Sequence, residues 1–397
     1  MISLLLSLQF IACSGCNNSK PIDTGSIEND PIPFTNNWGQ WMDMGQLSDG
    51  SAAISYYDST QGAVGLAVGR NDNSTWLHQG IDGYPNEQGL DEGDRGKYTA
   101  LAVADDGQVW VVYYDVGLRT LRYGSKKVDT ESPQDGDWTV GVADTGSGGT
   151  PDAGLYPAIS LDSLSNPVIS HYDNFRNTLR TVHWDGASFS AEVVDEGTDG
   201  TDQAGETVDA NVGEFSAIAI DQDVEYITYY DRANGALKMA WGTAGAYTIE
   251  TVDSGLETIL NEDGTTTEND SDVGQWTSIA VSDGLFYIAY QDATNNAVKL
   301  ASGRPGNWTF EVVDSGNLIG ADTAIAIREG NIFVGYQDGY TQDLKLAVRQ
   351  GDSWSRSSVL TEGAVGFHNN LMIDASGLYI SSYDFGSERA IFQISPQ

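Results

Sequence analysis

The chain has 397 residues, of which 40% are hydrophobic and 10% aromatic, so it carries enough apolar side chain to build a folded core despite its acidity. Its 19 lysines and arginines stand against 57 aspartates and glutamates, which gives a formal net charge of -38 at pH 7. A surface of that sign repels the phosphate backbone and gains nothing from counterion release, which excludes nucleic acid as a partner.

The chain begins with a segment typical of export signals. Residues 2–12 form an apolar run that is too short to cross a bilayer as a helix, since a crossing needs about 20 residues. The run leads into Ala12-Cys13-Ser14-Gly15-Cys16, and a small residue before a cysteine resembles the lipobox of bacterial lipoproteins. This resemblance implies a signal peptide over residues 1–16 and a lipid on either Cys13 or Cys16. Neither cysteine is followed by Asp, which in bacterial sorting signals implies the outer membrane or the cell surface.

A polar segment and a candidate closing strand follow the signal. Residues 17–37 are rich in Asn, Pro, Asp, Ser and Thr, a composition that predicts a flexible tether. Residues 33–43, with Trp38 and Trp41, resemble the outermost strand of the repeat that occupies the rest of the chain. The last copy of that repeat stops after its third strand, which would leave an open sheet edge. We therefore expect residues 33–43 to supply an N-terminal strand that completes the last copy and closes the ring.

A sequence repeat occurs in seven copies over residues 38–397. Each copy has an apolar strand, a short turn and a second apolar strand that ends in aspartate, and all copies but the last then have an outer pair of strands. In the fifth copy the four strands are expected at residues 276–281, 285–291, 297–302 and 308–313. Repeated units of four short strands with polar turns are typical of propeller blades. The sequence thus predicts an all-β fold, a seven-bladed β-propeller of four-stranded antiparallel blades.

Acidic residues are expected to gather on one face of this propeller. In an up-and-down blade the end of the second strand and the link to the next blade emerge on the same side, and the longest acidic insertions lie in those links. Crowded carboxylates repel unless a cation relieves them, and Ca²⁺ takes six to eight oxygen ligands. The candidate ligands are Asp58, Asp115, Asp173, Asp231, Asp292, Asp338, Asp384, Glu268, Asp270 and Asp272. The alternative for the strand-end aspartates is an Asx-type turn.

Aromatic residues recur where the innermost strands begin. The candidate ligand-binding residues are Tyr98, Tyr156, Phe215, Trp276 and Phe367, with His368 beside the last. The sixth copy has Asp322-Thr323 instead. Aromatic rings beside carboxylates at a channel mouth favour a sugar or a cationic ligand. The alternative is packing at the top of the inner strands.

The repeats resemble those of uncharacterised propeller lipoproteins from Gram-negative bacteria. The resemblance covers residues 38–397 and rests on Ile-Ser-Tyr-Tyr-Asp repeats followed by a strand such as Ala236-Leu237-Lys238-Met239-Ala240. More loosely, the chain resembles sialidase-like propellers, although their Ser-x-Asp-x-Gly-x-Thr-Trp turn is absent. These resemblances imply a propeller at the cell envelope and name no ligand.

We interpret the sequence as an exported binding or adhesion module whose acidic face takes a glycan or a protein, with calcium as the candidate ion. Only the lipid anchor would attach it to the membrane. The alternatives are a glycan-cleaving hydrolase with paired carboxylates and a scaffold that binds a basic protein. No zinc-binding histidine spacing, nucleophile elbow or phosphate-binding loop occurs, so no catalytic or cofactor-binding residue is assigned.

Overall fold

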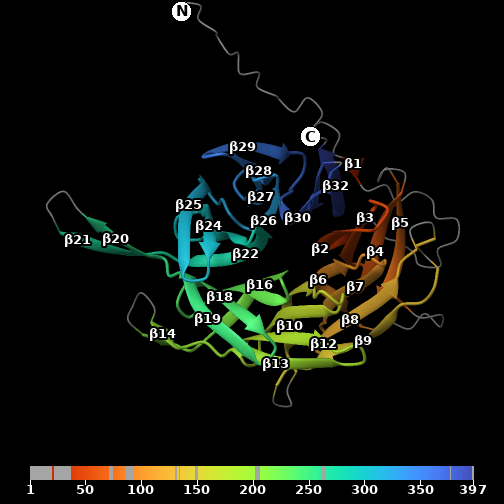
Figure 1. Ribbon diagram of the computed structural model, residues 1–397. Coiled ribbons are helices and arrows are strands. Elements are labelled where there is room, and N and C mark those ends of the chain that lie inside the picture. The colour runs from red at the N-terminus through yellow and green to blue at the C-terminus, as the bar shows by residue number, and fades with distance from the viewer. Residues whose placement is uncertain are drawn as a thin grey trace, which may run out of the picture.

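The computed structural model describes residues 20–21, 37–70, 75–85, 93–129, 132–133, 135–147, 151–201, 206–260, 265–375 and 377–395. The predicted signal with Cys13 and Cys16 lies outside the described residues, and so does most of the predicted tether. Regular structure in the described residues is entirely β, as the repeats predict (Figure 1). The described part of the chain contains no helix of the length and apolarity that a bilayer crossing requires.

Five sheets hold four antiparallel strands each, side by side in chain order, and match the second to sixth copies of the repeat. Their strands are β6 (Arg95–Val103), β7 (Gln108–Asp115), β8 (Thr120–Lys127) and β9 (Thr139–Asp144); β10 (Ala153–Leu161), β11 (Pro167–Asp173), β12 (Thr178–Trp184) and β13 (Phe189–Asp195); β16 (Val212–Asp221), β17 (Val224–Asp231), β18 (Ala236–Thr243) and β19 (Ala246–Asp253); β22 (Val273–Ser282), β23 (Leu285–Asp292), β24 (Ala297–Arg304) and β25 (Asn307–Ser315); β26 (Ala324–Arg328), β27 (Asn331–Asp338), β28 (Asp343–Gln350) and β29 (Ser353–Leu360). The four strands expected in the fifth copy fall inside β22 to β25.

The first and last copies share a mixed sheet of eight strands. Its members are β1 (Lys20–Pro21), β2 (Trp38–Gln46), β3 (Ala52–Asp58), β4 (Ala63–Arg70), β5 (Thr75–Asp82), β30 (Phe367–Ile373), β31 (Leu378–Asp384) and β32 (Arg389–Ser395). The two copies meet through one parallel pair, Trp38 of β2 opposite Arg389 of β32. Two hairpins, β14 (Gly200–Thr201) with β15 (Thr207–Val208) and β20 (Leu256–Leu260) with β21 (Thr266–Asp270), lie in the long acidic insertions.

The sheets bury their inner strands against one another. Strands β3, β11 and β31 are buried at every position, whereas the outermost strand β19 is largely exposed. Apolar side chains of successive sheets interlock: Leu66 of β4 packs in one cluster with Val111 and Tyr113 of β7. The core is therefore a series of layers between sheets, which explains why second strands read as nearly continuous apolar runs.

The first strands of the sheets occupy the middle of the molecule. In chain order, β2, β6, β10, β16, β22, β26 and β30 each pack against the next, and β30 also packs against β2. The outermost strands β5, β9, β13, β19, β25 and β29 lie at the periphery (Figure 1). The seven first strands thus surround a common centre.

The expectation for residues 33–43 was wrong in part. Residues 37–46 do not form an outermost strand, because β2 pairs with β3 along its length and is the first strand of the first copy. The strand that pairs antiparallel with the last strand of the last copy is β1, with Lys20 opposite Phe392 of β32, whereas β2 meets β32 at one parallel pair. Tryptophans led to the misassignment, since they occur in outermost strands of other copies as well as here.

A polar clip recurs between neighbouring sheets. An aspartate at the end of one outermost strand accepts hydrogen bonds from a tyrosine on the second strand and a cation on the third strand of the next sheet. In one example, Tyr290 Oη and Lys299 Nζ each lie 2.6 Å from Asp253 Oδ2. The equivalent aspartates are Asp82, Asp195 and Asp314, which bind Tyr113 with Arg122, Tyr229 with Lys238, and Tyr336 with Lys345.

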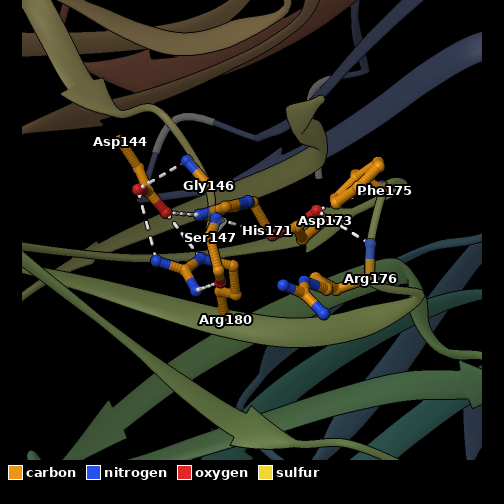
Figure 2. A network of polar contacts seen from close by, with 8 residues as sticks. All are labelled: Asp144, Gly146, Ser147, His171, Asp173, Phe175, Arg176 and Arg180. Atoms are coloured by element: carbon orange, nitrogen blue, oxygen red, sulfur yellow. Dashed lines mark hydrogen bonds and ion pairs between the residues drawn. The ribbon is translucent and has the colours of Figure 1, made fainter. Parts of the chain in front are cut away.

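In one clip a histidine replaces the tyrosine. His171 Nε2 lies 3.0 Å and Arg180 Nε 2.7 Å from Asp144 Oδ2 (Figure 2). Burial alone would raise the pKa of Asp144, but the hydrogen bonds and charges of His171 and Arg180 hold it well below its usual range. A buried carboxylate of this kind is tolerated because donors on both sides satisfy it.

The junction between the sixth and seventh copies is different. By register, Leu360, Ser382 and Ile391 occupy the positions of the aspartate, the tyrosine and the cation. Leu360 is buried and Ile391 packs against the same apolar cluster. Apolar burial therefore replaces the charged clip at this junction.

Trp38→Ala is expected to lower the free energy of unfolding by about 3–5 kcal/mol, because this side chain is 1% exposed and packs among Tyr383, Ala390 and Phe392 of the last copy. Urea unfolding at 25 °C measures the loss. Trp354→Ala, at a half-buried outer-strand position, is the control. Equal losses in the two variants would contradict the assignment of Trp38 to the joint between β2 and β32.

Tyr290→Phe should destabilise the protein by about 1–3 kcal/mol, because it removes one donor from the largely buried Asp253 and keeps the ring. Tyr340→Phe removes a hydroxyl from a side chain that is 70% exposed and should stay within about 0.5 kcal/mol of the parent. Chemical unfolding of the two variants compares them directly. Indistinguishable stabilities would show that the clip contributes nothing.

Acid should weaken the clips. The pKa of Asp253 is lowered because hydrogen bonds from Lys299 and Tyr290 outweigh burial, which alone would raise it. The resulting stabilisation is complete above the ordinary aspartate pKa of about 3.9 and is lost as the pH falls through the lower folded-state value. Asp253→Asn removes the charge at every pH, so its stability deficit against the parent should be largest at pH 5 and shrink toward pH 2. Thermal melts at both pH values test this, and a constant deficit would contradict it.

Candidate functional site

A pocket of about 290 Å³ lies where the seven first strands meet. Its lining consists of seven pairs of consecutive residues, one pair from the start of each copy. They are Trp41 and Met42, Tyr98 and Thr99, Tyr156 and Pro157, Phe215 and Ser216, Trp276 and Thr277, Asp322 and Thr323, His368 and Asn369. We call this the axial pocket and the first member of each pair its ring position.

Six of the seven ring positions carry aromatic side chains in a continuous series. Ring centroids are separated by 5.3 Å from His368 to Trp41 and by 5.1 Å from Trp41 to Tyr98. The series continues at 5.0 Å to Tyr156, 4.6 Å to Phe215 and 4.5 Å to Trp276. Neighbouring rings are tilted, a favourable arrangement for aromatic pairs. Asp322 occupies the remaining ring position, between Trp276 and His368 in chain order.

A glycine two residues earlier sets each ring position. A Cβ on Gly154 would come within 2.7 Å of the Leu121 backbone, and a Cβ on Gly274 equally close to the Leu237 backbone, so only glycine permits this contact. The first strand bulges just afterwards, and the ring residue itself has a positive φ, 49° at Tyr156 and 53° at Trp276. Non-glycine residues rarely adopt this conformation, which costs about 1–3 kcal/mol.

In four copies the residue after the ring position donates a hydrogen bond to the carbonyl of the preceding ring residue. Thr99 Oγ1 donates to the carbonyl of Trp41 at 2.5 Å, and Ser216 Oγ to that of Tyr156 at 2.8 Å. Thr323 and Asn369 donate in the same way to the carbonyls of Trp276 and Asp322. These bonds hold the backbone of the ring residues that accept them in place.

A second layer of tyrosines surrounds the ring. Tyr57 lies 5.5 Å from Trp41 between ring centroids, and its hydroxyl donates to Asp94 at 2.7 Å. Tyr114 and Tyr230 donate in the same way to Asp152 and Asp272. In the last copy, Tyr383 Oη donates to Asn37 Oδ1 at 2.6 Å, which links the end of the chain to the residue before β2. Burial first and the neighbouring carboxylate second raise the pKa of Tyr57 above its ordinary range.

Asp322 is the one carboxylate among the lining residues, all of which the structure describes. Burial raises its pKa to about 7, although a hydrogen bond from the His368 backbone acts in the opposite direction. Burial also lowers the pKa of His368 to about 4, so this imidazole is neutral at pH 7. The pocket therefore holds one acid that changes charge near neutral pH.

The sequence located most of the ring. Tyr98, Tyr156, Phe215, Trp276 and His368 line the axial pocket, whereas Phe367 does not and packs edge-on against Phe385 at 4.7 Å. Trp41 was missed because its segment was taken for an outermost strand. Every ring position follows Gly-x, and Asn or Asp stands four residues before it in five copies. That spacing would have identified Trp41 as a ring residue and selected His368 rather than Phe367 at the ring position of the last copy.

The aspartates that end the second strands lie at the end of each sheet where the first strand begins. For example, Asp231 pairs with Val212 at the start of β16. The outermost strand ends at the same side, since Asp253 at the end of β19 pairs with Leu237 at the start of β18. Each of the second-strand aspartates accepts a backbone N–H of the turn that follows it. They are Asp58, Asp115, Asp173, Asp231, Asp292, Asp338 and Asp384. Asp173 is drawn in Figure 2 with Phe175 and Arg176 of its turn.

The other proposed metal ligands lie near the second long insertion. Glu268 and Asp270 are exposed on β21, and Asp272 accepts the Tyr230 hydroxyl. Among the described residues, no three His, Cys, Asp or Glu side chains are placed to hold one metal ion. Calcium at this face remains a prediction.

A smaller pocket of about 190 Å³ lies at the opposite edge of the sheets β10–β13 and β16–β19. Its His183 Nε2 lies 3.0 Å from Glu225 Oε1, and Tyr247 also donates to Glu225. Asp162 and Asp223 accept backbone N–H groups of the neighbouring loop. Because these polar groups bind one another, we take the axial pocket as the candidate site.

No family model and no curated protein matches the chain. Among solved structures, it is similar to the polysaccharide lyase Uly1, with 12% identity over 92% of this chain and 88% of that one and a TM-score of 0.52. The SapL1 lectin in complex with alpha methyl fucoside matches at 13% identity over 83% and 97%, TM-score 0.47. A fucose-specific lectin from Aleuria aurantia matches at 16% over 74% and 88%, TM-score 0.43. At these identities the likeness concerns the fold, a propeller-like set of four-stranded antiparallel sheets.

Proposed function

We propose that the chain is a closed seven-bladed propeller that binds a glycan in its axial pocket. The seven-blade assignment is supported by the seven lining pairs and by the glycine that precedes each of them. Closure is supported by the hydrogen bond between Tyr383 and Asn37. It joins the last copy to the first in the way that equivalent tyrosine hydrogen bonds join other neighbouring copies. Strand β1 would then be the outermost strand of the seventh blade.

The aromatic ring carries the glycan proposal. Sugars present apolar C–H faces that stack on aromatic rings and hydroxyls that need polar partners at the edge. The axial pocket offers both, with six rings and the carboxyl group of Asp322 among its lining residues. Its volume is at the small end of ligand pockets, which range from about 300 to 1,000 Å³. The pocket therefore suits the end of a glycan chain better than a long internal segment. The fold is compatible with this role, since Uly1, of similar fold, is named for acting on polysaccharide.

Binding is favoured over hydrolysis because glycoside hydrolysis ordinarily needs two carboxyl groups about 5–10 Å apart. Asp322 is the single carboxylate that lines the described pocket. A scaffold that binds a basic protein through the acidic face is the remaining alternative.

The cellular setting belongs to the same proposal. Residues 1–16 would direct export, and lipid on Cys13 or Cys16 would hold the propeller at the bacterial outer membrane or cell surface, where it acts as a binding or adhesion module. Calcium would act at the strand-end aspartates of the acidic face rather than in the axial pocket. These points rest on the sequence.

A glycan array with the purified chain, run with and without EDTA, tests the binding proposal. Trp276→Ala should weaken retention about tenfold or more, because a central aromatic contact typically contributes more than about 1 kcal/mol. Trp308→Ala, on the outermost strand β25, is the matched control and should bind as the parent does.

Loss of retention in EDTA would support calcium-dependent binding. Release of a cleaved product would favour the alternative that the chain is a glycan-cleaving hydrolase. No retention on any glycan would refute the proposed function and leave the scaffold. Equal binding by the Trp276 and Trp308 variants would move the site away from the axial pocket.

A further inference from the structure

We infer that the glycan taken by the axial pocket carries a protonated amino group, which Asp322 binds. This inference rests on the proposed function and names the class of its ligand, a terminal amino sugar. The observation behind it is the single exception in the ring: one carboxylate stands where the other six positions have aromatic side chains.

The lining of the pocket favours a cation over a neutral group. The faces of aromatic rings are negative, and an ammonium within about 6 Å of a ring centroid is attracted to them. Five Trp, Tyr or Phe rings and the imidazole of His368 surround the same space as Asp322, and none of the lining residues is Lys or Arg. The net charge of -38 adds a negative field at the entrance. A positive group on the ligand would therefore meet only attraction here.

The titratable groups around the pocket support the same assignment. Asp322, with a pKa near 7, is about half ionised at neutral pH because burial disfavours its charge. His368 beside it is neutral, and burial raises the pKa of Tyr98 and Tyr156 across the ring, so both stay protonated. Asp43, two residues beyond Trp41 on β2, has a raised pKa despite hydrogen bonds from Leu101, Met44 and Asn370. An ammonium beside Asp322 would favour its charged form, and binding would release a proton.

A neutral ligand would bring no opposite charge to this carboxylate, which otherwise has the backbone hydrogen bond from His368. A buried ionised group costs free energy unless it is paired, and a buried protonated one needs an acceptor for its proton. The amine of an amino sugar satisfies Asp322 while the ring carbons stack on Trp276 or His368 beside it. A free sugar hydroxyl offers the hydrogen bond but not the charge.

Titration calorimetry at pH 6.5 with two matched oligosaccharides tests the inference. Glucosamine oligomers carry free amines, and N-acetylglucosamine oligomers of the same length are neutral. The parent chain should bind the glucosamine series at least tenfold more tightly. Asp322→Asn should reduce that preference to about twofold or less and keep the affinity for the neutral series. Asp283→Asn, an exposed turn residue between β22 and β23, removes the same charge away from the pocket and should keep the preference.

The outcomes separate the two proposals. Binding of the neutral series as tightly as the charged one would overturn the amino-sugar inference and leave glycan binding intact. Binding of neither series, with no other glycan retained on the array, would remove the proposed function itself. A preference that persists in Asp322→Asn and disappears in Asp283→Asn or in 0.5 M salt would assign it to the general acidic field, which also overturns the inference. Melting curves of both variants establish that they are folded.

Discussion

The arrangement of the whole molecule depends on the close approach of backbone at the inner end of each sheet. A glycine at or just before the start of the first strand sits against the preceding copy at a distance that no side chain allows, as at Gly39 against Ala390 and Gly154 against Leu121. The strand must then bulge, and the residue two positions later turns inward with a positive φ. One steric constraint, repeated in every copy, thereby produces both the packing of the sheets and the inward set of rings.

Polar clips join neighbouring sheets near their outer strands, and the three members of a clip depend on one another. The tyrosine, the cation and the aspartate of a clip are all largely buried, so each needs the other two. Lys238 and Lys299 also lie about 5.8 Å and 5.7 Å from the rings of Tyr229 and Tyr290, which adds a cation–π contact within the clip. Many acids of this chain are therefore structural partners, which is why acid abundance alone is a poor guide to a metal site.

Periodicity made the fold largely predictable from sequence, while positions inside the repeat were less so. Alternating apolar strands with terminal aspartates identified the copies and the strands β22 to β25, because burial between sheets imposes that pattern on every copy. Asp322 and Trp41 were harder. Asp322 lacks an aromatic ring, and Trp41 lies in the first copy, where no preceding copy marks the start of the repeat. The clip pairs were also missed, since they join residues 22 to 46 positions apart that only register brings together.

The apolar junction formed by Leu360, Ser382 and Ile391 gives the molecule a temperature response that is not uniform. Burial of hydrocarbon weakens on cooling, whereas a hydrogen-bonded ion pair does not share that dependence. Chilling thus acts first on the boundary before the final repeat, which also adjoins the meeting point of the two chain ends. On cooling, the last copy is in this way expected to loosen from the sixth before the charged junctions do.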